Sequence, residues 1–578
     1  MINSGNQSQQ DEVGQSKAID VLCVVILVAY FLYFALPAIS GAFSEDDLSA
    51  LCSYWFSGTL KRLVWENICF WRGIGRPAAG LYYLPLSHLF RIDPQPYRIV
   101  QISILGAVIP IVYYLARLLA SSRSVAFLAI LAFCYHPRLA NLVGNGSYIY
   151  DVLCGFFYFA ALTYHVHIRE KRLRLRPVQW VVFLALYVCA LNSKEIAVTL
   201  PVIILIYEFL KYSQQSEPQN FVRWMLYDAS PALVSGAITA VYCYNKLYGQ
   251  GFAGNFSPEF VEQRLDSGQV PPWVAAALEL YKSHYSWRRF IDSNAHFVSE
   301  LFYLAPSHVL SGATLVAIWA LIFAYAFFRR NRTLQLMAFW VVITPLPLAF
   351  VTPRGGARLY IVLFGWAMIF AKLAWDVITL FSKLPGLLAQ GGEGGLAASP
   401  ATVGGVPAGL DLSKTQSADV VDLARKTFRV TSRAFAIAVV ACGLALFTGW
   451  EHQRLGLDRA FRDSGKKTLH VIRAIGSLNL RPSPGSTILL KPEKHFLQNG
   501  FYPGFFASFA PNDPLRELIA KASPEYWRCV ALLAFGDRSL QIQVEGQHQL
   551  TEEQIAKLNY VISFDEFQAT IVRGPPPG

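Results

Sequence analysis

The chain has 578 residues, of which 54% are hydrophobic and only 15% are charged, whereas an average soluble domain has about 25% charged residues. The apolar residues form long blocks, most of them near the roughly 20 residues that a helix needs to cross a bilayer. This pattern excludes an ordinary soluble protein. The net charge of +12 comes from basic residues in short loops between the blocks, which is typical of cytoplasmic loops, so we expect no nucleic-acid partner.

We predict an α-helical, multi-pass membrane protein with about eleven spanning segments. The segments lie near residues 18–40, 98–119, 125–140, 148–168, 178–192, 195–212, 226–247, 308–328, 333–351, 357–380 and 433–450. The first is too long for a signal-peptide core, and we expect it to be retained. Pro137 and Pro201 lie in the region of the third to sixth predicted segments, where broken helices fit the pattern.

The orientation follows from two basic clusters, residues 169–176 and 329–332, because short basic loops stay in the cytoplasm. The tail 1–17 and the Gly-rich linker 381–432 are then cytoplasmic. The polar loops 41–97 and 248–306 lie outside, as does a small α+β domain over 451–578, which follows the last helix 433–450. The main transmembrane module covers 18–380. In a bacterium this places the chain in the inner membrane.

Three adjacent carboxylates, Glu45, Asp46 and Asp47, follow the first span. Like charges this close raise at least one pKa, which suits a general base or a metal ligand. The plainer interpretation is the start of a solvated helix, where acids are favoured. Arg76 follows in the same loop, between Trp71 and the aromatic run that ends at Tyr83. This stretch has the pattern of an interfacial amphipathic helix, in which Arg76 either binds a phosphate or anchors at the headgroups.

Further charged residues stand at the predicted helix ends. His136 ends the third span, Asp151 opens the fourth, and Lys194 with Glu195 joins the fifth and sixth almost without a loop. Ionisable groups at membrane depth usually pair or face a cavity, although Lys194 and Glu195 also fit simple boundary residues.

Two arginines, Arg354 and Arg358, stand on a tight turn before Tyr360, where they could hold a phosphate bidentately. The predicted topology puts all of these clusters outside. Boundary charges without a function should fall on both faces, so this convergence predicts one shared external site.

The order of the clusters resembles the GT-C glycosyltransferases, most closely the protein O-mannosyltransferases and the tetratricopeptide-containing membrane mannosyltransferases. The matching motifs are Asp46-Asp47, Arg76-Pro77, His136-Pro137 with Asp151, Lys194-Glu195 before Thr199-Leu200-Pro201, and Arg358-Leu359-Tyr360. Asn141 stands where that branch usually has Glu, Ile149 stands where it usually has Arg, and the tail lacks tetratricopeptide repeats. The resemblance, which covers about 18–380, therefore indicates the class and leaves the acceptor open.

The resemblance implies a polyprenyl-phosphate-linked monosaccharide donor, an extracytoplasmic acceptor hydroxyl on a protein, lipid or polysaccharide, and inversion at the anomeric carbon. Asp47 or Asp46 would take the acceptor proton, and Arg358, Lys194, Arg76 and Arg354 would hold the lipid phosphate. Glu195, His136, Asp151 and Tyr360 would support them. A divalent cation could assist, but the sequence contains no dedicated ligand set, so the metal is left as unknown.

Two other classes fit part of the pattern. A transporter or flippase for a lipid-linked or anionic substrate also places charges in broken helices, but it should show internal repeats and charges near mid-bilayer. A non-catalytic scaffold with a partner-binding tail would not need acids and bases gathered on one face.

The topology is tested with single cysteines in a cysteine-free background. Gly392→Cys should resist an impermeant thiol reagent in intact cells, whereas Gly500→Cys should react, because the linker is expected inside and the tail outside. Labelling at 392 with protection at 500 would invert the orientation.

Overall fold

The computed structural model describes residues 4–44, 47–48, 50–51, 54–55, 59–70, 76–171, 174–214, 220–248, 285–304, 309–350, 355–381, 412–463, 465–492, 531–532, 534–535, 539–544, 558–564 and 568–574. Glu45, Asp46 and Arg354, and positions 392 and 500 of the topology test, lie outside these ranges.

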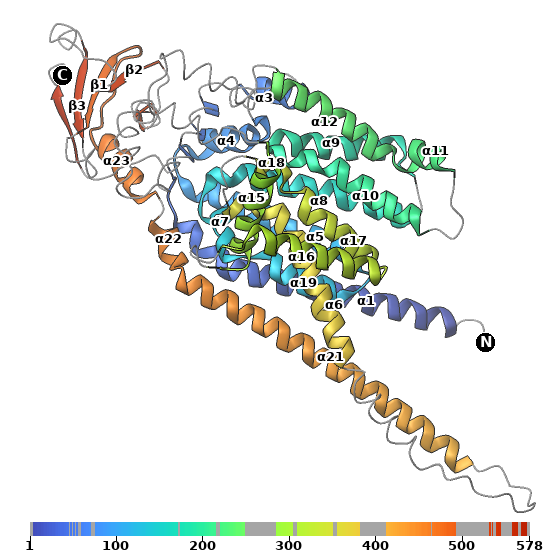
Figure 1. The fold of residues 1–578 in the computed structure, drawn as a ribbon. Helices are drawn as coiled ribbons and strands as arrows, with labels where there is room; N and C mark the ends of the chain where they lie inside the picture. The colour runs from blue at the N-terminus through green and yellow to red at the C-terminus, as the bar shows by residue number, and fades with distance from the viewer. Residues whose placement is uncertain are drawn as a thin grey trace, which may run out of the picture.

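The protein is a bundle of apolar helices with a small sheet at one end (Figure 1). Seven helices in the described part are long and apolar enough to cross a membrane, or eight if the bent pair Arg123–Cys134 and Pro137–Gly144 is one span. Two shorter apolar helices, Pro177–Ser193 and Gly312–Phe328, accompany them. The predicted class, an α-helical integral membrane protein, is confirmed, and a helix occupies each of the eleven predicted segments.

The helices that correspond to the predicted segments are α1 (Ser4–Ala35), α5 (Pro94–Ala120), α6 (Arg123–Cys134), α8 (Ile149–Glu170), α9 (Pro177–Ser193), α10 (Leu200–Ser213), α12 (Ser230–Tyr248), α16 (Gly312–Phe328), α17 (Arg332–Ile343), α19 (Tyr360–Phe381) and α21 (Leu412–Arg454). Of these, α8 is central, with 72% of its span buried, whereas only 11% of the α21 span is buried. Helices α5 and α9 pack on α8, and α19 packs on α6. Helix α21 runs along the outside of the bundle (Figure 1).

Short elements join the ends of these helices. They are η1 (Leu36–Ser40), α3 (Leu60–Ile68), α4 (Pro77–Phe90), η2 (Pro137–Leu139), α7 (Asn141–Gly144), η3 (Gly146–Tyr148), η4 (Glu195–Thr199), α11 (Phe221–Arg223), η5 (Trp224–Asp228), α15 (Trp287–Leu301), α18 (Leu346–Ala349), η8 (Gly356–Leu359) and α22 (Leu457–Asp463).

Two helix breaks fall where the prolines indicated. Pro137 disfavours helical backbone at His136, and the chain bends by 47° there. Pro201 lies in the first turn of α10, directly after the 3-10 turn η4. These breaks leave short polar segments at one end of the bundle.

The stretch around Arg76 differs from the prediction. Helix α4 does not lie exposed at an interface, because Ala78, Ala79, Tyr82 and Tyr83 are buried in the bundle. The preceding helix α3 instead exposes large apolar side chains, Trp65 among them.

The predicted α+β tail is confirmed in its described part. Four strands, β1 (Thr487–Pro492), β2 (Gln541–Val544), β3 (Tyr560–Phe564) and β4 (Ala569–Arg573), form a sheet in the order β2-β1-β3-β4. Strand β1 pairs in parallel with β2 and β3, and β4 is antiparallel to β3. Helix α23 (Lys466–Ser477) contacts β3 and β4. The sheet lies beyond the end of the bundle that carries α4 and α7 (Figure 1).

Candidate functional site

A seven-residue segment, 145–151, is the centre of the polar contacts at one end of the bundle. The Asn145 side chain accepts a hydrogen bond from the Ser147 backbone N–H at 2.9 Å and so caps η3. Helix α8 then begins at Ile149. We call this the Lys194 end of the bundle, and the end where α8 finishes the Glu208 end.

A buried ion pair joins α8 to the chain that leaves α9. Lys194 is extended, between the last residue of α9 and the first of η4, and its Nζ lies 2.5 Å from Asp151 Oδ1. Both side chains are almost fully buried. Lys194 thus stands at the boundary between α9 and η4, and its charge is enclosed and compensated inside the protein.

A second ion pair lies beside the first. The Arg76 guanidinium donates to both Glu195 oxygens, through Nε at 3.1 Å and Nη2 at 2.8 Å, and sits over the Tyr150 ring at 5.1 Å. The Tyr54 hydroxyl donates to the Arg76 carbonyl at 2.8 Å. Burial lowers the pKa of Arg76, but Glu195, together with Tyr150 and Asp151, raises it above its usual value. About a third of each paired side chain is exposed, so the pair faces an accessible surface.

Arg358 is the third cation of this group. It lies on η8 over the Tyr148 ring at 5.8 Å and acts electrostatically on Lys194. The η8 turn is capped by Glu300 of α15, which accepts from the Gly356 backbone N–H at 3.0 Å. A β-carbon at Gly355 would lie 1.1 Å from Glu300 Oε2, so this approach requires glycine. Within the described ranges, no carboxylate forms an ion pair with Arg358.

The Asp47 carboxylate lies inside the protein and not at its surface. It is fully buried, and its Oδ2 accepts from Arg98 at 3.0 Å and from the Ser44 backbone N–H at 2.9 Å. Arg98 also donates to the Ala42 carbonyl at 2.8 Å. A β-carbon at Gly146 would lie 2.6 Å from Asp47 Oδ1. Asp47 therefore fixes the loop after η1 to α5 and to the start of α8.

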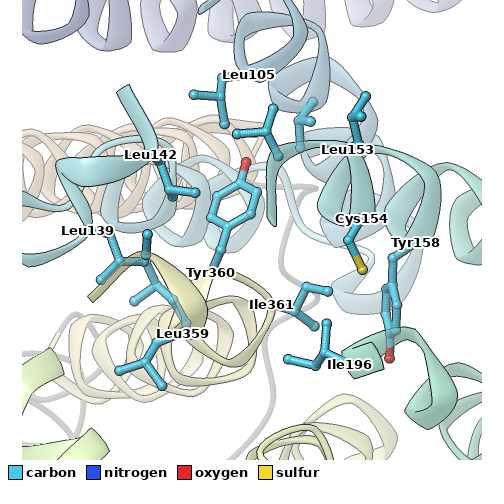
Figure 2. Close-up of a cluster of buried hydrophobic side chains, with 14 of the residues drawn as sticks. Leu105, Leu139, Leu142, Leu153, Cys154, Tyr158, Ile196, Leu359, Tyr360 and Ile361 are labelled. Atoms are coloured by element: carbon cyan, nitrogen blue, oxygen red, sulfur yellow. The ribbon is translucent and has the colours of Figure 1, made fainter. Parts of the chain in front are cut away.

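His136 and Tyr360 belong to the buried surroundings of the site. His136 Nε2 is 3.0 Å from the Leu301 carbonyl, and its ring stacks on Tyr303. Tyr360 stacks on Phe133 and lines a small cavity together with His136. Figure 2 shows the Tyr360 ring among buried apolar side chains, with its hydroxyl directed toward Leu105 and with Leu142 beside the ring.

The Glu208 end also carries compensated charges. Glu208 is buried and accepts from Arg169 at 2.8 Å and 2.9 Å, His165 lies 2.9 Å from it, and Asp228 pairs with Arg169 at 2.9 Å. At this end Asp20 binds Arg117 and Arg123. These buried ion pairs stabilise helix packing, whereas the predicted site residues Arg76, Lys194 and Arg358 lie together at the Lys194 end. Arg169, counted in a basic loop, is part of this network.

The sequence did not indicate several residues of the Lys194 end. Arg98 looked like the polar boundary of an apolar span, and Tyr148, Tyr150 and Glu300 had no motif around them. Gln101 stands one helical turn after Arg98. Two polar residues on one face of an apolar helix indicate a polar contact there, so this spacing could have identified Arg98. Gln101 donates to the carbonyls of Leu142 and Asn145.

No protein-family model and no curated protein matches the chain. Among solved structures, ArnT from Cupriavidus metallidurans bound to undecaprenyl phosphate has 14% identity and a TM-score of 0.46, covering 96% of this chain and 99% of that one. The oligosaccharyltransferase AglB from Archaeoglobus fulgidus, in complex with an inhibitory peptide and a dolichol-phosphate, has 11% identity and a TM-score of 0.41, covering 95% and 69%. Similarity this low does not indicate a function for this chain.

The Asp47–Arg98 pair gives a prediction about stability. Asp47→Asn leaves a charged guanidinium buried without its counter-ion, which typically costs about 3–5 kcal/mol. We expect a large drop in the thermal midpoint in detergent and partial recovery in Asp47→Asn/Arg98→Met. Glu66→Gln breaks the exposed Arg62–Glu66 pair and should cost at most about 1 kcal/mol. Equal midpoints for Asp47→Asn and Glu66→Gln would show that the buried pair does not hold the loop.

Proposed function

We propose that the chain is an integral membrane glycosyltransferase, which moves a monosaccharide from a polyprenyl-phosphate donor to an extracytoplasmic acceptor hydroxyl with inversion. Its site is the Lys194 end of the bundle. The motif order and the gathering of Arg76, Lys194 and Arg358 around the start of α8 support this proposal.

One observation carries it, and it concerns Arg358. The pairs Arg76–Glu195 and Lys194–Asp151 are each internally neutral, whereas Arg358 forms no ion pair with a carboxylate within the described ranges. Arg358 is partly exposed, on a turn held by Glu300. A preorganised guanidinium of this kind suits a phosphate, to which it can donate two parallel hydrogen bonds.

The paired cations have a second role in this proposal. Lys194 and Arg76 are engaged by carboxylates, so they hold α4, α8 and η4 together around the site and add to its field. Arg354, four residues before Arg358, is the proposed second cation for the phosphate. His136 and Tyr360 support the turn and the start of α19 from the interior.

The carboxylate that acts in the reaction is Asp46 in this proposal. Asp47 is enclosed with Arg98, so it acts as the positioning residue of the loop, while its neighbour Asp46 is the proposed general base. The base takes the proton of the acceptor hydroxyl as its oxygen attacks the anomeric carbon. The bond from that carbon to the phosphate oxygen breaks on the opposite face, and the departing lipid phosphate keeps the electron pair, stabilised by Arg358.

The donor's lipid tail needs an apolar surface near the turn. A groove between α15 and α16 has a mostly apolar lining, formed by Arg288, Ile291, Asp292, Gly312, Ala313, Val316, Ala317 and Ala320. The carboxyl end of α15 carries Glu300, which caps the Arg358 turn. We assign this groove to part of the polyprenyl chain, because α15 joins it to the proposed phosphate site.

The base is tested with Asp46→Asn, which removes the charge and keeps the size. A general base contributes about a hundred- to ten-thousandfold in rate, so turnover with a polyprenyl-phosphate sugar should fall by that much. Donor affinity and the thermal midpoint should be nearly unchanged. Glu45→Gln is the matched control and should transfer sugar normally. Full turnover by Asp46→Asn would remove it as the base, and a stable but inactive Asp47→Asn would move the role to Asp47.

The phosphate site is tested with Arg358→Lys and Arg358→Ala. Removal of a preorganised donor costs on the order of a hundred- to a thousandfold in rate, and lysine keeps the charge but loses the bidentate fork. We expect Arg358→Ala to lose most of the turnover and Arg358→Lys to recover only a small part. Arg329→Lys, at the Glu208 end, is the control. Normal release of lipid phosphate by a folded Arg358→Ala variant would contradict the proposal.

A further inference from the structure

The last membrane helix returns the chain to the loop that follows the first one. Helix α21 ends at Arg454 beside the core, and α22 then packs against η1. Figure 1 shows α22 between the end of α21 and the small sheet, next to the Lys194 end of the bundle. A segment more than 400 residues away in sequence therefore lies against the start of the acidic loop.

A chain of hydrogen bonds docks α21 on the core. The Tyr135 hydroxyl lies 2.7 Å from His452 Nδ1, and His452 Nε2 lies 2.9 Å from Asp458 Oδ1. Tyr135 and His452 are buried, and Phe34 of α1 stacks on the Tyr135 ring at 4.6 Å. Because these groups come from α1, the end of α6, α21 and α22, the contact fixes the place where α22 begins.

Three glycines then allow a close approach between α22 and the loop. A β-carbon at Gly144 would lie 2.4 Å from the Phe461 ring, and one at Gly41 would lie 2.7 Å from the Phe461 carbonyl oxygen. Gly465 has φ of +69° and would place a β-carbon 2.0 Å from the Phe43 carbonyl oxygen. Phe461 is buried in this contact.

The same loop also makes the polar contacts that hold Asp47. Ala42 and Asp47 bind Arg98, and the Ser44 hydroxyl donates to Asn145 at 3.0 Å. Asn145 directly follows Gly144, the residue under Phe461. The described residues of the loop thus contact α5, the segment before α8 and α22.

We infer that the α21–α22 segment (described residues 448–463 and 465) is a positioning element for the loop after η1 (described residues 41–44 and 47–48), with Phe461 as its central contact. This gives the C-terminal part of the chain a role at the site, since it holds the loop that carries the acids. The part of the inference that concerns turnover rests on the proposed function, whereas the part that concerns the loop does not.

The test compares Phe461→Ala with Phe435→Ala, which shortens an exposed phenylalanine earlier in α21, outside the segment that begins at residue 448. The loop is monitored by hydrogen exchange of the amides of Ser44, Asp47 and Leu48, which are bonded at 2.9, 3.3 and 3.1 Å. In Phe461→Ala these amides should exchange roughly tenfold faster or more, as expected for a locally loosened segment. Phe435→Ala should exchange like the wild type, and Phe461→Leu should recover much of the protection.

Turnover gives the second readout. Misplacement by about 1 Å can cost on the order of a hundredfold in rate, so Phe461→Ala should lower kcat by up to that amount with donor KM nearly unchanged. Unchanged exchange in a folded Phe461→Ala variant would overturn the inference. Faster exchange in Phe461→Ala, with no sugar transfer by the wild type, would support the positioning role and reject the proposed function.

Discussion

The Lys194 end of the bundle depends on one buried ion pair, between Lys194 and Asp151 at 2.5 Å. A buried cation or carboxylate is costly without its partner, and removing one member of such a pair is strongly destabilising. The pair therefore fixes the junction of α9 and η4 against the first turn of α8. Because Glu195 follows Lys194 and Tyr150 precedes Asp151, the same constraint sets the partners of Arg76, which pairs with Glu195 and lies over Tyr150.

The short segment 145–151 carries this constraint to the rest of the site. Asn145 holds Ser44, Gly146 lets Asp47 approach, and the Tyr148 ring lies under Arg358. Glycine is needed at 146 because a β-carbon would meet the Asp47 carboxylate. Charged groups from five separate stretches of the chain can therefore meet around one helix start, a convergence that a longer or bulkier segment would prevent.

The two ends of the bundle differ in how their charges are used. At the Glu208 end, Arg169 is bound by Glu208 and Asp228 together, and Glu170 accepts from Tyr207 and pairs with Lys211 and Arg332. Such networks hold the helices together. At the Lys194 end, Arg358 forms no ion pair with a carboxylate within the described ranges, and it stands on a turn that Glu300 caps. The combination of an accessible cation and a turn that fixes its position makes this end the candidate binding site.

The sequence by itself determined the membrane class, the positions of the helices, the breaks near Pro137 and Pro201, and the stretches that carry charge. These follow from segment length, apolarity and the missing proline N–H, which are properties of the local chain. Only the tertiary structure decided which charged side chains pair with one another. Packing of α5 and α8 encloses Asp47 with Arg98, and packing of α15 on η8 gives Arg358 its capped turn. The return of α22 to the loop was equally invisible in sequence, because a contact between Phe461 and Gly144 depends on how distant helices pack.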